Sequence, residues 1–468
     1  RGAPPPPTTC AAHAANCTDD GETVIVRNGL VELAFSRAQG GLASIKVGAG
    51  PTVPVSLSLR AYSHRLATTI LPWFLRRSGH YAFHPAGEAV ALGGGGAAAG
   101  LTITAGPHLT EVGLSAGPYA SLAIRLRSGA VAPEVEWTVG PLPDAQDVVL
   151  RVDSALSTGS SFFTDANGRE YLRRTRGERA TFIPAPIEAP YANPIGRDYY
   201  PTTVGAYLAD EAAGLQLSLL SDRAQGASSL ASGSLEVMLH REAEMSDELG
   251  NPETLQERLG GVPIIVRGVS MLVVSSAADG PALRRDLASK TYHAPQVVVA
   301  ARAGAVESGS ASLLTRDLPP QIDVLKLGAS DGGAGLDLRV MHTFGEKEHG
   351  ALSTPVDVDV AAAFAAPLAA LAVEPATPAG LPLEAVVAPP KALRRGERIF
   401  AGPKLFDFDD LSKAGVDVPG VAPVAAPPLI PRPPAIAKGP AKRGVLRVNP
   451  LEIKAVVLRG HGGGTGVA

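Results

Sequence analysis

Residues 162–241 hold the stretch that decides the fold. It opens with FFTDANGRE at 162–170, continues with DYYP at 198–201 and closes with LEVMLHR at 235–241. Within it, Asn167-Gly168 lies between residues that favour strands, and a type I′ turn needs positive φ at both central positions, which Asn and Gly tolerate. The pair therefore predicts a hairpin, and the whole stretch predicts four or five strands joined by turns.

Two segments of this stretch have an apolar residue at every second position, which predicts strands with one buried face and one solvent-exposed (wet) face. The first places Leu215, Leu217 and Leu219 on the buried face and Gln216 and Ser218 on the wet face; the second places Leu235, Val237 and Leu239 opposite Glu236, Met238 and His240. Between them, residues 221–230 read as a polar loop that is too long for a tight hairpin.

The same motifs resemble the C-terminal half of glycoside hydrolase family 38, the retaining α-mannosidases, and most of all its lysosomal or vacuolar acid type. The family pattern runs Phe or Tyr, TD-NGRE, YYP, a DR-QG-SSL loop and LE-M-HR. Its counterparts here are residues 163–170, 199–201, 222–230 and 235–241. Several linked motifs in one order are more specific than any single short match. With further matches on either side, the resemblance covers roughly residues 24–458.

The resemblance implies a mainly β fold: a large mutarotase-like β super-sandwich followed by smaller β-sandwich elements. We expect an irregular N-terminal segment at 1–20, the super-sandwich at 21–300 and the smaller sandwich region at 301–468. Proline and alanine are over-represented at 375–395 and 416–444, which predicts linkers that interrupt the last region. Helix signals are few, and residues 281–289 are expected to form one short helix.

Bulk composition excludes several classes of protein. The 468 residues carry a formal net charge of −3 with 19% charged residues, so neither nucleic acid nor an anionic membrane surface is an expected partner. Glycine and proline together make up about a fifth of the chain, which fits short strands joined by many turns. No apolar run reaches the ~18 residues that a membrane-spanning helix needs.

Cys10 and Cys17 are the two cysteines of the chain, and Asn16-Cys17-Thr18 is a formal glycosylation sequon. Together with the resemblance to lysosomal relatives, close cysteines at a sequon imply a disulfide, glycosylation at Asn16, and a place in the secretory pathway, either in the lysosome or vacuole or outside the cell. The alternative is two unrelated thiols in a loose segment. Because the chain begins at Arg1, we expect it to start inside a longer precursor.

His80 and His84 have the i, i+4 spacing of a zinc pair on a helix. Pro85 and the neighbouring aromatic residues instead predict a strand, in which four residues span roughly 13 Å, too far for two imidazoles to share an ion. Residues 113–117 fit the G-x-S-x-G form of a nucleophile elbow, but strand-like residues follow where that motif needs a helix. We therefore expect no metal ligands and no serine nucleophile in this chain.

A retaining glycosidase needs two carboxylates about 5 Å apart. Asp165, Glu170, Asp210 and Asp222 are available, but sequence spacing pairs none of them. Asp165 more simply caps the Asn167-Gly168 turn, and Asp222 more simply orders its loop. In the resembled family the nucleophile, the acid and the Zn²⁺ ligands lie in an N-terminal barrel, whose signature of His and Asp before Pro-Gly-Trp does not occur here. We therefore assign no catalytic residue to this chain.

Tyr200 is the residue expected to bind substrate. In the resembled family, the tyrosine before the proline of YYP reaches from the β-rich half into the mannose pocket, and the match falls on Tyr200. A tyrosine hydroxyl both donates and accepts hydrogen bonds, while its ring packs against apolar groups. The alternative is a core aromatic residue that precedes a strand.

The function implied by the resemblance is hydrolysis of terminal α-mannose residues of N-glycans and oligosaccharides, with retention and with help from Zn²⁺. This chain would brace the catalytic barrel of the same precursor, supply part of the sugar pocket, and be inactive alone. The first alternative is a stand-alone, non-catalytic carbohydrate-binding or structural β-protein. The second is an independent epimerase or lyase on a mutarotase-like sandwich, which would need a catalytic His or Glu in a groove.

Overall fold

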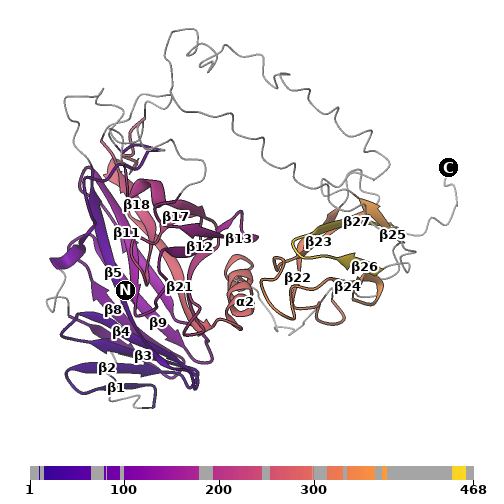
Figure 1. The fold of residues 1–468 in the computed structure, drawn as a ribbon, viewed down its shortest axis with the longest axis horizontal. Coiled ribbons are helices and arrows are strands. Elements are labelled where there is room, and N and C mark those ends of the chain that lie inside the picture. Colours follow the sequence, from indigo (N-terminus) through magenta and orange to yellow (C-terminus); the bar gives the residue numbers. More distant parts are fainter. Residues whose placement is uncertain are drawn as a thin grey trace, which may run out of the picture. The chain divides into compact units, whose positions relative to one another are not determined.

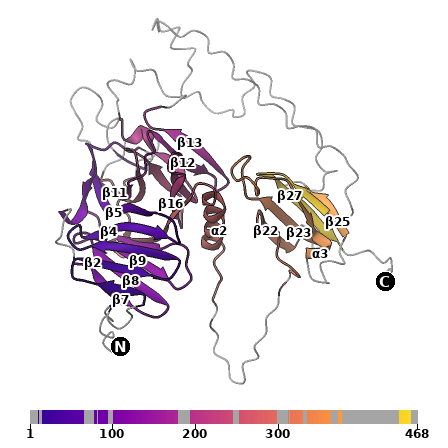
Figure 2. The same cartoon turned by 60° about the horizontal axis from the view of Figure 1, so that its bottom comes forward.

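The computed structural model describes residues 10, 15–64, 78–80, 82–94, 100–178, 193–244, 253–297, 299, 312, 314–329, 335–363, 372–376 and 445–459. The chain divides into two compact units, one made of Arg1–Ala305 with Thr343–Thr354 and the other of Val306–His342 with Pro355–Ala468. Strands dominate both units (Figures 1 and 2). The mainly β fold predicted from the sequence is confirmed.

The first unit contains a ten-stranded antiparallel sheet in the order β1-β2-β3-β4-β5-β11-β18-β17-β14, with β6 paired to β5. The strands are β1 (Cys17–Asp19), β2 (Thr23–Arg27), β3 (Val31–Ser36), β4 (Gly41–Val47), β5 (Thr52–Ser63), β6 (Val90–Ala91), β11 (Gln146–Ser154), β14 (Tyr200–Thr202), β17 (Gln225–Ser228) and β18 (Ser234–Glu242). Strand β1 lies within the N-terminal segment for which we expected irregular structure.

A nine-stranded antiparallel sheet has the order β13-β12-β15-β16-β21-β10-β9-β8-β7. Its strands are β7 (Thr102–Ala105), β8 (Leu109–Ser115), β9 (Ala120–Arg127), β10 (Glu134–Val139), β12 (Ser161–Ala166), β13 (Glu170–Thr175), β15 (Gly205–Asp210), β16 (Leu215–Ser221) and β21 (Val266–Ser276). A separate two-residue ladder joins β19 (Arg258–Leu259) to β20 (Val262–Pro263), and short 3₁₀ turns occur at η3 (Leu92–Gly94) and η5 (Gly196–Asp198).

The two sheets share one apolar core. Residues of the ten-stranded sheet such as Leu59 and Leu150 belong to the same buried cluster as Trp137 and Leu217 of the nine-stranded sheet. Successive strand residues point to opposite faces, so each strand sends every second side chain into this core. The first unit is therefore a β-sandwich, whose layers can be followed in Figure 1.

The predicted hairpin at Asn167-Gly168 is present. Strands β12 and β13 pair around it, and Asn167 and Gly168 have φ values of 68° and 75°. A carboxylate oxygen of Asp165 accepts a hydrogen bond from the Gly168 N–H at 2.7 Å. The turn therefore forms where residues that tolerate positive φ stand between two strands.

The expected wet face of β16 is not exposed. Helix α2 (Gly280–Tyr292) packs against β16 and β21, and it includes the predicted helix at 281–289. Gln216 is 8% exposed and Ser218 is fully buried. The prediction was wrong because alternation shows which residues are polar but not what covers them. Arg284 of α2 donates to the side-chain oxygen of Gln216 at 3.1 Å, which satisfies that buried amide.

Two further expectations differ from the structure. The polar loop at 221–230 contains β17, which pairs with both β14 and β18. The segment with His80 and His84 forms no strand among its described residues and joins the sandwich through an isolated bridge between His64 and Pro85.

The second unit has a smaller core of its own, which includes Leu338, Val340, Val448 and Val456. A four-stranded sheet has the order β22-β23-β27-β25, and β24 pairs with β26. The elements are β22 (Ile322–Ala329), β23 (Gly335–His342), β24 (Val356–Asp359), α3 (Val360–Ala363), β25 (Ala372–Ala376), β26 (Val445–Val448) and β27 (Ile453–Arg459). Apart from the first two residues at 375–376, the expected linkers at 375–395 and 416–444 lie outside the described residues.

Among the described helices, none combines the length and the apolar composition needed to cross a bilayer.

Candidate functional site

Tyr200 begins β14, the strand at one edge of the ten-stranded sheet. It pairs with Ala227 of β17, and Pro201 pairs with Gly226. Proline has no N–H to donate to a ladder, so an edge strand is where a sheet tolerates it. The DYYP motif therefore ends in a short edge strand that carries Tyr200 at its first position.

The Tyr200 ring is half-buried and packs against the core of the sandwich. Its centroid lies 5.8 Å from that of Phe162 in an edge-on arrangement, and the guanidinium carbon of Arg174 lies 4.4 Å from the ring centroid. Arg174 is held in turn by Thr164, whose hydroxyl oxygen accepts from Nε at 3.0 Å. A cation over an aromatic face is attractive and restricts the ring. Tyr200 is thus oriented by strand β12 beneath it and by strand β13 beside it.

Asp165 fixes the backbone directly after Tyr200. Its side chain is fully buried, although it belongs to β12 of the other sheet. One carboxylate oxygen accepts four hydrogen bonds from consecutive residues: Thr202 Oγ1 at 2.7 Å, Thr203 N at 2.9 Å, Val204 N at 2.9 Å and Gly205 N at 3.0 Å. Hydrogen bonds to a charged acceptor are stronger than those between neutral groups. The sequence predicted only the contact of Asp165 with its own turn.

Glu236 fixes the residue directly before Tyr200. It is 1% exposed on β18, and one carboxylate oxygen accepts from the Tyr62 hydroxyl at 2.6 Å and from the Tyr199 hydroxyl. The other oxygen accepts from Arg151 Nε at 2.7 Å, which completes a buried ion pair. Burial and the Glu236 charge raise the pKa of both Tyr62 and Tyr199, so both hydroxyls stay protonated as donors.

Two buried carboxylates from different sheets therefore hold the YYP segment, Glu236 through Tyr199 and Asp165 through the backbone that follows Pro201. Adjacent strand residues face opposite ways, so anchoring Tyr199 on one side directs Tyr200 to the other. Sequence reasoning missed Glu236 because it placed that residue on a wet face. A carboxylate in the midst of the apolar LEVML run was the signal that could have identified it.

The other carboxylates considered from the sequence have local partners. Asp210 is largely buried, and its oxygens accept from backbone N–H groups; Asp222 accepts from one backbone N–H and pairs with the next residue; Glu170 is exposed. The donors are Ser157 N at 2.8 Å and Ala213 N at 2.9 Å for Asp210, and Val269 N at 3.0 Å with Arg223 Nε at 2.9 Å for Asp222. These contacts are structural, and we assign none of the three to catalysis.

Metal-ligating side chains do not gather in the part of the chain that the structure describes. No group of three or more His, Cys, Asp or Glu side chains there is arranged to hold a metal ion. Tight protein sites for Zn²⁺ use three or four such ligands. The described residues therefore do not fit a zinc site.

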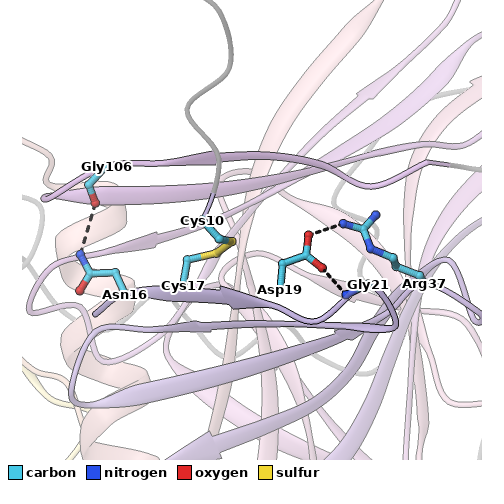
Figure 3. Close-up of a disulfide and its surroundings, with 7 residues drawn as sticks. All are labelled: Cys10, Asn16, Cys17, Asp19, Gly21, Arg37 and Gly106. Atoms are coloured by element: carbon cyan, nitrogen blue, oxygen red, sulfur yellow. Dashed lines mark hydrogen bonds and ion pairs between the residues drawn. A yellow bond between two sulfur atoms is a disulfide. The ribbon is translucent and has the colours of Figure 1, made fainter. Parts of the chain in front are cut away.

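The N-terminal segment is joined to the sandwich by a disulfide between Cys10 and Cys17 (Figure 3). Both cysteines are buried, and their Cα atoms lie 4.9 Å apart. Asn16 is partly exposed, and its side-chain nitrogen donates to the Gly106 carbonyl at 3.3 Å. A glycan attached to that nitrogen would have to accommodate or replace this contact.

Comparison with known proteins points to one family. Residues 26–248 match the model of the glycosyl hydrolases family 38 C-terminal domain. Lysosomal alpha-mannosidase of Cavia porcellus is 38% identical over 257 residues, 52% of this chain and 24% of that protein. The Homo sapiens protein of that name is 37% identical over 266 residues, 54% of this chain and 25% of its own length. The chain thus spans about a quarter of these relatives.

A solved structure shows the same fold. A protein in the glycosyl hydrolase family 38 from Enterococcus faecalis superposes with a TM-score of 0.55 at 10% identity, over 92% of this chain and 43% of that protein. An alpha-mannosidase from Enterococcus faecalis gives a TM-score of 0.51 at 11% identity, over 69% and 37% of the two chains. At such identities the likeness concerns the fold alone.

Proposed function

Because residues 26–248 belong to the C-terminal domain of glycosyl hydrolase family 38, we propose that this chain is the C-terminal portion of an α-mannosidase. The enzyme would hydrolyse terminal α-mannose residues of N-glycans and oligosaccharides with retention. The match to the family model carries the proposal. Relatives named lysosomal alpha-mannosidase that are 37–38% identical over half of the chain support it.

The chemistry is assigned to a catalytic barrel that would precede this chain in the same precursor. A retaining glycosidase needs a nucleophile and an acid on opposite sides of the scissile bond. We assign neither a nucleophile nor an acid among the described residues of this chain, and those residues do not fit a zinc site. The nucleophile, the acid and the Zn²⁺ ligands would therefore all come from the barrel, which the sandwich would brace.

Tyr200 is the proposed contribution of this chain to the sugar pocket. The family motif falls on it, and the anchors of Asp165 and Glu236 hold its strand from both sides. An oriented hydroxyl that pairs with a sugar hydroxyl contributes roughly 0.5–1.5 kcal/mol, and preorganisation of its strand avoids an ordering cost on binding. We propose that Tyr200 donates or accepts one hydrogen bond with bound mannose while its ring stays packed on Phe162.

A secretory-pathway location, with delivery to the lysosome or vacuole or outside the cell, is part of the same proposal. The disulfide between Cys10 and Cys17 supports it, because disulfides persist in oxidising compartments. The names of the mammalian relatives agree with a lysosomal destination.

Hydrolysis of an aryl α-mannoside tests the function. The purified 468-residue chain and a longer product of the same gene would be assayed side by side, with proton NMR used to identify the anomer released first. The proposal expects turnover with retention from the longer product. The chain alone should show no turnover and should bind no stoichiometric zinc. Turnover with stoichiometric zinc in the chain alone would overturn the assignment of the chemistry to an upstream barrel, and a gene that encodes no such barrel would favour the alternative readings of the sequence.

A stand-alone carbohydrate-binding or structural protein is the second candidate. The absence of a metal-ligand group among the described residues is equally compatible with it. Mannoside binding by the chain, combined with a gene that encodes no catalytic barrel, would favour this candidate.

A further inference from the structure

A cavity of about 330 Å³ lies beside β17 and β18. Its lining includes His80, Gln225, Met238, His240, Glu257 and Ile264, but not Tyr200. Small-molecule sites in proteins have volumes of about 300–1,000 Å³, so this cavity has room for one small ring. The proposed function of the chain does not use it.

The floor of the cavity is the side of β18 that faces away from the sandwich core. Leu235 and Val237 are fully buried in that core, whereas Met238 and His240 are half-buried. Met238 and Ile264 supply apolar surface to the lining. The cavity therefore combines a hydrophobic floor with polar groups, as small-molecule sites usually do.

Arg241 fixes one wall, and its charge is already paired with the buried Asp147 carboxylate. Its Nε donates to Asp147 at 2.7 Å, one terminal nitrogen donates to the Gly79 carbonyl at 2.9 Å, and the other donates to the Ala82 carbonyl at 2.8 Å. These contacts hold the segment that carries His80 against the sheet. Among the described lining residues Arg241 is the one arginine or lysine, and its pairing with Asp147 leaves no uncompensated positive charge for an anionic ligand.

The remaining polar groups are close to electrically neutral. Burial lowers the pKa of the His240 imidazole, and the nearby Glu257 carboxylate offsets this only in part, so His240 is neutral near pH 7. Glu257 is exposed, and the described residues around the cavity include no metal-binding group. A multivalent cation therefore lacks its ligands here.

Two polar atoms of the lining residues are buried without a hydrogen-bond partner: Gln225 Oε1 and His80 Nδ1. The other end of the Gln225 amide is satisfied, since its nitrogen donates to the Met238 carbonyl at 3.1 Å. An unpartnered buried polar atom costs about 1–3 kcal/mol, so such atoms call for a partner that the protein does not supply. A hydroxyl group both donates and accepts, and it suits an amide oxygen and an imidazole nitrogen alike.

We propose that this cavity binds one neutral, hydroxyl-rich ring, a single monosaccharide unit. Its hydroxyls would pair with Gln225 and His80 after small side-chain adjustments, and its C–H face would lie on Met238 and Ile264. The inference does not depend on the role proposed for Tyr200.

Methionine methyl NMR on the complete 468-residue chain tests the proposal. The chain has four methionines, so selective ¹³C-methyl labelling gives four signals, from Met238, Met245, Met271 and Met341. Substitution Met238→Leu assigns the reporter in the cavity. On titration with methyl α-mannoside, the Met238 signal should move and saturate, while the Met271 and Met341 signals stay in place. The same titration on Tyr200→Phe should give an unchanged affinity.

Variants of the lining connect the signal to the cavity. Gln225→Leu and His80→Phe each remove one unpartnered atom while keeping a similar shape, and each should weaken the mannoside affinity read from the Met238 signal about two- to tenfold, the effect of one lost hydrogen bond. Gln225→Leu also removes the donor to the Met238 carbonyl, so the Met238 signal of that variant is assigned again before its titration. Gln39→Leu, at an exposed glutamine, is the matched control and should leave it unchanged. Unshifted Met271 and Met341 signals verify that each variant folds.

Three results would overturn the proposal. The first is a Met238 signal that does not move up to high millimolar mannoside. The second is equal movement of all four signals, which indicates a solvent effect. The third is a stronger response to inorganic phosphate than to mannoside, which would make the cavity an anion site.

Discussion

Substitution Glu236→Gln is the sharpest test of the anchors that hold the YYP segment. Glutamine keeps the length and shape of the side chain but removes its charge. Glu236 is 1% exposed, and the paired Arg151 side chain is 14% exposed. The variant therefore leaves a guanidinium without its counter-charge, and it presents an amide N–H₂ where a carboxylate oxygen accepted hydrogen bonds.

The magnitude follows from this burial. Removing one partner of a buried ion pair costs about 3–5 kcal/mol, and we take about 3 kcal/mol because the amide oxygen still accepts from Tyr62 and Tyr199. The first unit comprises Arg1–Ala305 and Thr343–Thr354. At about 2.1 cal/mol/K per residue, the unfolding entropy of a unit of this size is roughly 670 cal/mol/K, so its Tm should fall by about 4–5 °C.

Thermal unfolding followed by tryptophan fluorescence is the appropriate assay. Trp137 is fully buried in the first unit, so the change in its fluorescence on unfolding reports that unit. Glu32→Gln is the control, because Glu32 and Arg27 pair at 3.4 Å with side chains 43% and 36% exposed, and such surface pairs contribute at most about 1 kcal/mol. Equal Tm values for Glu236→Gln and Glu32→Gln would refute the reasoning.

Three other predictions concern the disulfide and the buried carboxylates. Thiol labelling of the unreduced protein should find no free cysteine, since Cys10 and Cys17 are joined; two labelled thiols would contradict the pairing. Asp165→Asn should lower the free energy of unfolding by about 1.5–3 kcal/mol in urea, because a charged acceptor of five hydrogen bonds is lost. Burial raises the pKa of Glu348, but hydrogen bonds and charges from two arginines of α2 outweigh it, so the net pKa is lowered. The stabilising contribution of the Glu348 carboxylate is therefore present above its unfolded pKa near 4.5, and it is lost as pH falls through the lower folded pKa. Glu348→Gln should flatten the decline of Tm in acid. A decline that is unchanged in this variant would contradict the prediction.

Local features of the fold could be predicted from the sequence. The Asn167-Gly168 hairpin depends on two residues that tolerate positive φ, and the strand that carries Leu235, Val237 and Leu239 depends on simple alternation. Both signals act between neighbours in the chain, so they need no knowledge of what lies above the sheet. The motif order likewise indicated the family, because it reflects common ancestry rather than packing.

The anchors of the site could not be predicted in this way. Glu236 is buried because Phe83 and Ile195, from segments distant in the chain, pack with the β18 residue Met238 on the same side of the sheet. Asp165 receives hydrogen bonds from residues 37–40 positions away, which no spacing rule anticipates. A polar residue in an alternating strand reads as solvent-facing unless the covering layer is known, and that layer is a tertiary feature.

Kinetics of Tyr200→Phe in the enzyme that includes the catalytic barrel test the central claim most directly. The account predicts a decrease in kcat/KM of about two- to tenfold with Tm nearly unchanged, the effect of one neutral hydrogen bond to a sugar hydroxyl. Tyr199→Phe should do less to kcat/KM and should lower Tm instead, because its hydroxyl donates to the buried Glu236. If Tyr200→Phe leaves kcat/KM unchanged while Tyr199→Phe lowers it, the register is wrong by one residue. If neither variant changes kcat/KM, the YYP segment only packs, and this chain supplies no wall of the mannose pocket.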